Sequence, residues 1–289
     1  MRSPHHAARP GPAALLLVAG GIVSLQMGAA AAKQIFPAVG SGGAVLLRLA
    51  VGAVILAAVA RPRLDSVRPL ALLFGAVLAV MNLCFYASLT RIALGPAVTV
   101  EFLGPLVLAV VTSRRRLDAL WALLAFAGVA ALSWEGPGQR VDAVGLALAG
   151  AAGAAWAAYI VLSQRLGAAA PGFGGLAVAV AAAAVVAAPV GIAQGGAQLV
   201  EPRVLLFGAA VGVLSSAVPY ALEFLALRRL PASIFGILMS IEPVVAAVIG
   251  FALLGEGLRV VQAAGIVLVC VASAAVTAGR PEPPELSDG

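Results

Sequence analysis

The residues Val100-Glu101-Phe102-Leu103-Gly104-Pro105 place a carboxylate inside a long apolar run, with a proline four residues after it. A related stretch, Ser240-Ile241-Glu242-Pro243, occurs late in the chain. A charge at the centre of a bilayer costs roughly 2.5–3.5 kcal/mol on insertion scales, so an acidic residue there needs a functional explanation. Proline lacks the N–H of an interior helical residue and kinks or breaks its helix. The two stretches therefore predict two membrane helices, each interrupted beside a buried glutamate.

The composition is that of a membrane protein. Of the 289 residues, 62% are hydrophobic and only 10% are charged, and the mean hydropathy is +1.08. A soluble domain is about half apolar and a quarter charged. The sequence has none of the alternating ten-residue segments that build a membrane β-barrel. It therefore predicts an all-α, multi-pass membrane protein, in which the net charge of +6 reflects orientation in the bilayer and not binding to nucleic acid.

Ten apolar runs are long enough to cross a bilayer, which takes about 20 residues. They cover residues 12–32, 43–60, 69–89, 93–112, 117–134, 143–163, 173–193, 204–226, 232–254 and 258–278. The first run is too long for the core of a signal peptide, so we expect an uncleaved first helix. Residues 1–11 form a tail before it, and residues 279–289 predict a disordered tail after the last run.

The basic residues predict the orientation of these ten helices. With the N-terminus in the cytoplasm, twelve of the 18 Lys and Arg residues lie on the cytoplasmic side and five on the outer side, while Arg48 lies inside the second run. An excess of Lys and Arg marks cytoplasmic loops. We therefore expect both termini to be cytoplasmic.

The two halves of the chain resemble each other. Phe85–Arg91 is similar to Leu222–Arg229, about 138 residues later, and the same offset carries Pro105 onto Pro243. Further single-residue matches are Gly20 with Gly150, Gln34 with Gln164, and Gly128 with Gly265.

Because each half holds five runs, an odd number, the second half enters the membrane from the opposite side. The sequence thus predicts two inverted five-helix repeats, residues 12–134 and 143–278, joined by a loop at 135–142. Transporters built from inverted repeats bind their substrate near the middle of the membrane, between the repeats.

Small residues recur at four-residue intervals in two of the runs. They are Gly20, Ser24, Gly28 and Ala32 in the first run, and Gly145, Ala149, Gly153 and Ala157 in the sixth. Such stripes let helix backbones approach closely in lipid. We expect both stripes to be helix–helix contacts.

Four ionisable residues lie inside the runs: Arg48, Glu101, Glu223 and Glu242. They should face a protein interior or a watery cavity, because lipid cannot solvate them. The absence of an N–H at Pro105 also frees the carbonyl of Glu101, so this residue can offer two oxygens to an ammonium group or a proton. Arg48 can bind a carboxylate through two parallel hydrogen bonds. A simpler alternative is that the charges pair with one another, for example Glu101 with Arg48.

Uncharged polar residues in the runs can line the same cavity. They are Gln26, Asn82, Tyr86, Trp156, Tyr159, Ser215, Ser216, Tyr220 and Ser240. Helix kinks are expected at Pro105, Pro219 and Pro243.

Signatures of catalysis are missing from the sequence. No histidine lies in an apolar run, and there is no H-E-x-x-H, G-x-S-x-G, P-loop or Cys/His metal cluster. We therefore predict no catalytic residues, no metal and no cofactor. Cys84 and Cys270 lie inside apolar runs and are expected to be packing residues.

The motifs resemble those of the EamA branch of the drug/metabolite transporter superfamily, and within it the bacterial threonine and homoserine exporters. The matching residues are Glu101–Pro105, Ser113–Arg115, Ser215–Glu223, Arg229–Pro231, Phe235–Pro243 and Leu254–Glu256, with earlier matches at Gly28–Ala29, Ala32–Lys33, Phe36–Pro37 and Arg48–Ala50. The resemblance covers nearly the whole chain except the two tails. The Ala-rich sixth and seventh runs depart most from the pattern.

This resemblance implies a transporter of the bacterial inner membrane that exports small amino acids, such as threonine, homoserine and their analogues, by alternating access. It also implies that protons drive the transport. The buried residues are compatible with this function, because a zwitterionic amino acid needs an anionic and a cationic partner. Glu101 or Glu242, with Arg48, supplies both.

Two other functions fit the sequence less well. The first is an EamA-type permease for another metabolite or a cationic drug, which would keep the glutamates and would not need Arg48. The second is a membrane scaffold or enzyme subunit without transport activity, in which the buried glutamates would matter for folding alone.

Overall fold

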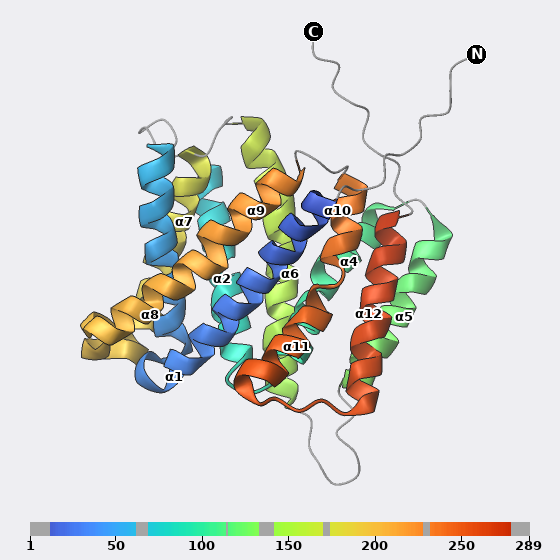
Figure 1. Ribbon diagram of the computed structural model, residues 1–289. Helices are drawn as coiled ribbons and strands as arrows, with labels where there is room; N and C mark the ends of the chain where they lie inside the picture. Colours follow the sequence, from blue (N-terminus) through green and yellow to red (C-terminus); the bar gives the residue numbers. More distant parts are fainter. Residues whose placement is uncertain are drawn as a thin grey trace.

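The computed structural model describes residues 12–61, 69–113, 115–132, 142–169, 174–227 and 232–278, and every element within these ranges is helical (Figure 1). In chain order the helices are α1 (Pro12–Ala60), α2 (Pro69–Ser88), α3 (Leu94–Glu101), α4 (Leu103–Thr112), α5 (Arg116–Leu132), α6 (Ala143–Ala169), α7 (Gly174–Gly195), the 3₁₀ turn η2 (Gly196–Val200), α8 (Pro202–Gly212), the π-helical turn η3 (Val213–Ala217), α9 (Val218–Leu227), α10 (Ala232–Met239), α11 (Glu242–Leu254) and α12 (Val260–Ala278). The prediction of an all-α chain is confirmed.

Seven helical segments of the described chain are long and apolar enough to cross a membrane: Pro12–Ala60, Pro69–Ser88, Leu94–Thr112, Ala143–Leu166, Gly174–Val200, Ile237–Leu254 and Val260–Ala278. The chain is therefore a multi-pass membrane protein. Seven is fewer than the ten predicted runs because α1 contains two of them, and because α5 and Pro202–Ala217 are shorter than a full span.

The helix α1 is divided in two at Gly40, which has the backbone angles φ 68° and ψ 173°. Glycine adopts a positive φ without the steric cost that other residues meet there. Beyond the break, the side-chain oxygen of Gln194 in α7 accepts a hydrogen bond of 2.7 Å from the N–H of Gly42, so this backbone donor is satisfied. Figure 1 shows the first limb of α1 descending to this turn and the second limb returning from it. Residues 33–42, which lie between the first two predicted runs, are thus mostly helical.

Two helices are interrupted at the opening motifs, slightly before the expected positions. One breaks at Phe102, between α3 and α4, and the other at Ser240 and Ile241, between α10 and α11. Pro105 and Pro243 then lie in the first turns of α4 and α11. The reason is that a first-turn residue needs no N–H for helical bonding, so proline is tolerated there and the break falls ahead of it.

Small residues make the closest helix contacts, as the two stripes predicted. A Cβ built on Gly104 would lie 1.8 Å from the carbonyl oxygen of Gly153, so α4 and α6 touch through their backbones. In the first stripe, the hydroxyl of Ser24 donates to the carbonyl of Leu214 at 2.8 Å, which ties α1 to η3. Gly28 meets Ser215 of the same turn. Helix–helix contacts are thus confirmed at Ser24 and Gly28 of the first stripe and at Gly153 of the second.

Candidate functional site

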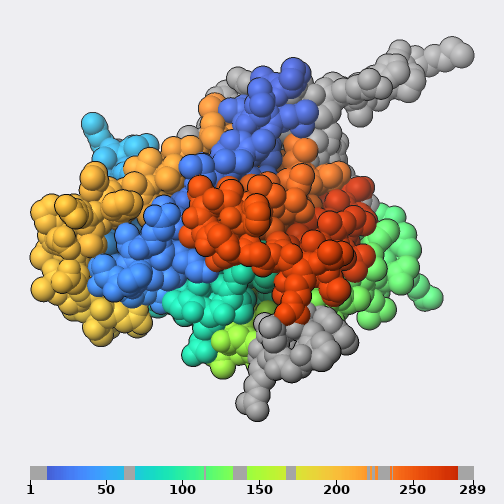
Figure 2. Space-filling view, turned by 60° about the horizontal axis from the view of Figure 1, so that its bottom comes forward, coloured from blue at the N-terminus to red at the C-terminus, as the bar shows by residue number. Residues whose placement is uncertain are grey.

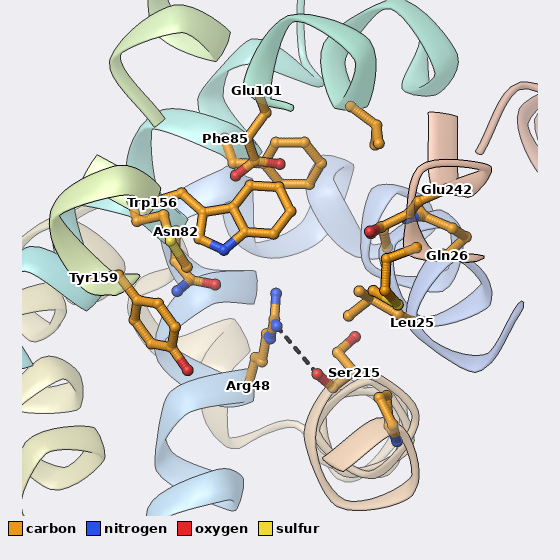
Figure 3. Close-up of a pocket in the computed structure, with 15 residues that line it drawn as sticks. Leu25, Gln26, Arg48, Asn82, Phe85, Glu101, Trp156, Tyr159, Ser215 and Glu242 are labelled. Atoms are coloured by element: carbon orange, nitrogen blue, oxygen red, sulfur yellow. Dashed lines mark hydrogen bonds between the residues drawn. The ribbon is translucent and has the colours of Figure 1, made fainter. Parts of the chain in front are cut away.

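A cavity of about 190 Å³ lies between the two halves of the chain (Figure 3). A water needs only roughly 10–15 Å³, so the cavity has room for a small metabolite or several waters. Its lining residues come from α1, α2, α3, α6, η3, α9, α10 and α11: Leu25, Gln26, Ala29, Arg48, Met81, Asn82, Phe85, Val98, Glu101, Trp156, Tyr159, Ser215, Pro219, Met239 and Glu242. In Figure 3 the Arg48 guanidinium points into the cavity, with Trp156 and Tyr159 on one side and Gln26 and Glu242 on the other.

The carboxylate of Glu242 lies at the start of α11 and is only 4% exposed. Its Oε1 accepts a hydrogen bond of 2.9 Å from Nε2 of Gln26, which is 2% exposed. The N-terminal end of a helix carries a partial positive charge that favours an anion. The helix end and the Gln26 amide together stabilise a carboxylate at this buried position.

Glu101 is the last residue of α3, so the two glutamates lie at opposite ends of their helical segments. Within the described residues its carboxyl makes no hydrogen bond, and it shares the wall of the cavity with Glu242 and Arg48. Its backbone carbonyl lies against α6, where a Cβ built on Gly153 would come within 2.5 Å of the oxygen. The carbonyl freed by Pro105 therefore packs against α6. Glu101 lines the cavity, and the group that it can offer there is its side-chain carboxyl.

Arg48 lies on the second limb of α1, where hydrogen bonds orient its guanidinium. Its Nη1 donates to the hydroxyl of Tyr86 at 3.2 Å, and its Nη2 donates to the backbone carbonyl of Ser215 at 3.1 Å. The guanidinium carbon also lies 5.6 Å from the centre of the Tyr86 ring, within range of a cation–π interaction. Tyr86 is fully buried. These contacts orient a planar cation toward the cavity.

Two polar atoms of the cavity have no hydrogen-bond partner among the described residues: Oε1 of Gln26 and Oγ of Ser215. Buried polar atoms in proteins are nearly always hydrogen-bonded, to protein or to water. Both atoms belong to side chains at the wall of the cavity. A polar molecule in the cavity can therefore complete their hydrogen bonding.

Most of the predicted site residues come together here. Gln26, Arg48, Asn82, Glu101, Trp156, Tyr159, Ser215, Pro219 and Glu242 line the cavity, and Tyr86 contacts Arg48 behind its wall. Four others do not line it: Ser216, Ser240, Pro105 and Pro243. Ser240 instead donates to the hydroxyl of Ser273 in α12 at 3.1 Å. The side chains of Tyr220 and Glu223 lie outside the described residues.

The alternative prediction of direct pairing between Glu101 and Arg48 is wrong. The ion pairs within the described residues are Lys33 with Glu256 and Arg91 with Asp142, and Glu101 takes part in neither. The contacts of the guanidinium include the Tyr86 hydroxyl and the Ser215 carbonyl.

The apolar part of the lining was not predicted. It consists of Leu25, Ala29, Met81, Phe85, Val98 and Met239. The sequence does hold a weak signal for two of them. Ala29 is three residues after Gln26 and Phe85 is three residues after Asn82, so each shares a helix face with a predicted polar residue.

A second polar cluster lies at the lower end of Figure 1, where α3 begins and α11 ends. Glu256 pairs with Lys33, and its second oxygen accepts a hydrogen bond of 2.7 Å from the N–H of Leu94. Figure 2 turns this end forward and shows the end of α11, in orange, beside α1, in blue. One carboxylate thus joins the first limb of α1, the start of α3 and the loop after α11.

A more exposed ion pair lies near the same end. Nη1 of Arg91 is 3.3 Å from a carboxylate oxygen of Asp142, just ahead of α6. The pKa of Asp142 lies below its usual value because the carboxylate accepts the N–H of Gly145, and because the Arg91 guanidinium lies beside it. This pair joins the loop before α3 to the start of α6.

Comparison with known proteins gives consistent matches. The model of the EamA-like transporter family matches residues 143–278. The threonine/homoserine exporters RhtA of Escherichia coli (strain K12) and Salmonella typhimurium (strain LT2) are each 44% identical over 267 residues, which is 91% of this chain and 90% of theirs. A solved crystal structure of a protein superposes with a TM-score of 0.63 over 91% of this chain and 95% of that one. This superposition, at 21% sequence identity, shows a shared fold and nothing more.

Proposed function

Because the chain belongs to the EamA-like transporter family, we propose that it exports threonine, homoserine and similar small amino acids, with the cavity around Arg48, Glu101 and Glu242 as its substrate site. The observation that carries the proposal is this cavity, which holds an oriented cation and two carboxylates at its wall. The 44% identity to exporters that are named for threonine and homoserine supports the same substrates.

The chain crosses the bacterial inner membrane ten times in this account, with both ends in the cytoplasm. The break at Gly40 supports two crossings within α1. The continuous course of α8, η3 and α9, from Pro202 to Leu227, supports one crossing that is longer than Pro202–Ala217 alone. In Figure 1 the start of α1 and the end of α12 lie at the same end of the molecule, which supports an even number.

An inverted repeat is supported by the positions that line the cavity. The offsets between the halves pair Glu101 with Met239, Met81 with Pro219, and Gln26 with Trp156, and all six residues line the cavity. A site between two symmetric halves is expected to be lined by such equivalent positions.

Gly128 and Gly265, another predicted equivalent pair, meet each other directly. A Cβ on Gly128 would lie 2.7 Å from the carbonyl oxygen of Gly265, and one on Gly265 would lie 2.4 Å from that of Gly128. Equivalent residues that contact each other reciprocally belong on a two-fold axis. This contact supports a pseudo-two-fold axis that passes between α5 and α12.

The cavity matches the chemistry of a small amino acid. Arg48 can bind the substrate carboxylate through a bidentate pair, which is the strongest geometry for this recognition. The carboxylates of Glu101 and Glu242 suit the ammonium group. Asn82 and Tyr159 add polar groups for a side-chain hydroxyl, and the aromatic wall includes Trp156, whose ring lies 5.3 Å from that of Phe102.

Proton coupling is assigned to Glu101. Glu242 has the Gln26 amide and a helix N-terminus to stabilise its charge, whereas Glu101 has no hydrogen bond within the described residues and ends its helical segment. Glu101 is therefore the carboxyl better suited to alternate between a proton and the substrate ammonium. A proton that enters from outside displaces the amino acid there, and its release to the cytoplasm restores the carboxylate.

Alternating access requires that one side of the cavity close while the other opens. In the proposed orientation Lys33, Glu256, Arg91 and Asp142 all lie on the outer side. The Lys33–Glu256–Leu94 cluster fastens the two predicted repeats together there. We infer that it closes the outer side in this conformation.

The proposal is tested by efflux from proteoliposomes loaded with labelled threonine, homoserine or a cationic dye. We expect threonine and homoserine to leave faster than from protein-free liposomes when the proton concentration is higher outside. Export of the dye alone would favour a cationic-drug permease, and efflux no faster than from protein-free liposomes would favour a scaffold.

A further inference from the structure

The helical segment that carries Ser215 has an irregularity that the transport scheme does not use. Between α8 and α9 the chain widens into the π-helical turn Val213–Ala217, in which the N–H of Val218 bonds to the carbonyl of Val213. Isolated π turns inside α-helices are uncommon and are frequent at functional sites. This turn lies at the wall of the cavity.

Pro219 follows the turn directly. In a regular α-helix the carbonyl of Ser215 would accept the N–H of residue 219, but proline has none. The carbonyl of Ser215 instead accepts the hydrogen bond from Nη2 of Arg48 at 3.1 Å. The sequence thus supplies a backbone acceptor at the wall of the cavity by removing its ordinary donor.

The first limb of α1 holds this turn in place. The hydroxyl of Ser24 donates to the carbonyl of Leu214 at 2.8 Å. One turn further along, a Cβ on Gly28 would lie 2.1 Å from Oγ and 3.0 Å from the N of Ser215. Ser215 is 1% exposed. The position of its carbonyl is therefore set by α1 as well as by its own helix.

We propose that the segment from Ser215 to Pro219 is the positioning element for Arg48: the carbonyl released by Pro219, together with the Tyr86 hydroxyl, orients the plane of the guanidinium toward the substrate carboxylate. The inference rests on the proposed function, in which Arg48 binds that carboxylate. Pro219 lines the cavity. Its effect on the affinity for the substrate comes from the position that it gives to Arg48. It is a specificity-determining residue for carboxylate-bearing substrates.

The variant that tests this is Pro219→Ala, which restores an N–H able to recapture the Ser215 carbonyl. Threonine efflux from proteoliposomes is measured over a range of internal threonine concentrations. We expect the KM for threonine to rise about tenfold, equivalent to about 1.4 kcal/mol, with kcat changed less than about twofold. Ser24→Ala, which only loosens the turn, should raise the KM about threefold. It serves as a second variant that keeps the proline.

Pro189→Ala is the matched control, because Pro189 is also inside a helix, α7, but is exposed and does not line the cavity. Its KM should equal that of the unmodified protein. A double-mutant cycle with Arg48→Lys separates positioning from general damage. Lysine is a flexible point charge that depends less on a fixed plane, so Pro219→Ala should change the KM less than about twofold in that background.

The outcomes are distinguishable. A KM increase that disappears in the Arg48→Lys background supports the inference. Unchanged KM values in both Pro219→Ala and Ser24→Ala, or equal increases with and without Arg48→Lys, overturn it while threonine export by the unmodified protein upholds the proposed function. Absence of threonine export by the unmodified protein and by Pro189→Ala would overturn both.

Discussion

The side-chain amide of Gln26 donates a hydrogen bond of 2.9 Å to a carboxylate oxygen of Glu242, and both residues are almost wholly buried. The bond joins the first limb of α1 to the start of α11, so it links the two predicted repeats at the wall of the cavity. It also couples the charge of the later glutamate to the packing of α1 against α11.

Replacing Gln26 with leucine should lower threonine export about tenfold. A hydrogen bond to a charged group contributes about 1.5–3 kcal/mol, and its loss leaves the Glu242 carboxylate less well satisfied. Initial efflux rates from proteoliposomes measure the effect. Gln164→Leu removes an exposed glutamine of α6 as a control and should export normally. Equal rates for both variants would show that the Gln26–Glu242 bond has no part in transport.

Arg48→Ala should abolish saturable export of threonine, and Arg48→Lys should raise its KM by about tenfold or more, because lysine cannot make the bidentate pair with a carboxylate. Arg203→Ala, at an exposed arginine of α8, is the control. The same efflux assay measures all three proteins. Normal threonine transport by Arg48→Ala would mean that Arg48 does not bind the substrate carboxylate.

The contact between Gly153 and the α3–α4 segment predicts a stability difference within one helix. A Cβ on Gly153 would lie 2.5 Å from the Glu101 carbonyl oxygen, whereas one on Gly150 would meet nothing within 4 Å. Overpacking of this kind costs about 1–3 kcal/mol. Gly153→Ala should therefore lower the Tm of the purified protein, while Gly150→Ala leaves it unchanged or raises it. A fall in Tm for both variants would contradict this packing.

Lys33→Gln should open the outer side of the cavity. It removes the partner of Glu256 in a cluster whose side chains are only 22% and 14% exposed, so the loss is larger than for a surface pair. Arg91→Gln, which breaks the more exposed pair with Asp142, is the comparison.

The opening is measured in protein with Cys84 and Cys270 replaced by alanine and a cysteine introduced by Val98→Cys at the cavity wall. A membrane-impermeant maleimide added outside should label the Lys33→Gln protein about tenfold faster than its parent, equivalent to about 1.4 kcal/mol. Arg91→Gln should have a smaller effect. Unchanged labelling by Lys33→Gln would mean that the cluster does not close the outer side.

The sequence was sufficient for the helical class and for much of the cavity. Charged residues are costly in lipid, so Arg48, Glu101 and Glu242 had to face inward, and the structure brings all three to one cavity. The apolar residues that line the cavity could not be predicted from the sequence. In a bilayer both lipid and protein interior accept leucine or methionine, so periodicity does not reveal which face of a membrane helix lines a cavity.

Backbone detail was predictable only in part. The prolines indicated the interrupted helices, but each break falls before its proline. The second helical segment begins early enough that the proline lies in its first turn, where no N–H is needed. The spacing of Ser215 and Pro219 contained the signal for a released carbonyl. Its partner, Arg48, is 167 residues away in the chain, and such long-range contacts depend on the packing of all the intervening helices.

The most direct test of the account is threonine export by Glu101→Gln, with Glu201→Gln at an exposed position as the control. In proteoliposomes with an imposed proton gradient, the Glu101→Gln protein should lose at least about 99% of gradient-driven efflux, because an amide cannot carry the proton and binds an ammonium group weakly. Glu201→Gln should transport normally. Gradient-driven threonine efflux by Glu101→Gln at the rate of the unmodified protein would contradict the central claim that this carboxyl couples proton and substrate in the cavity.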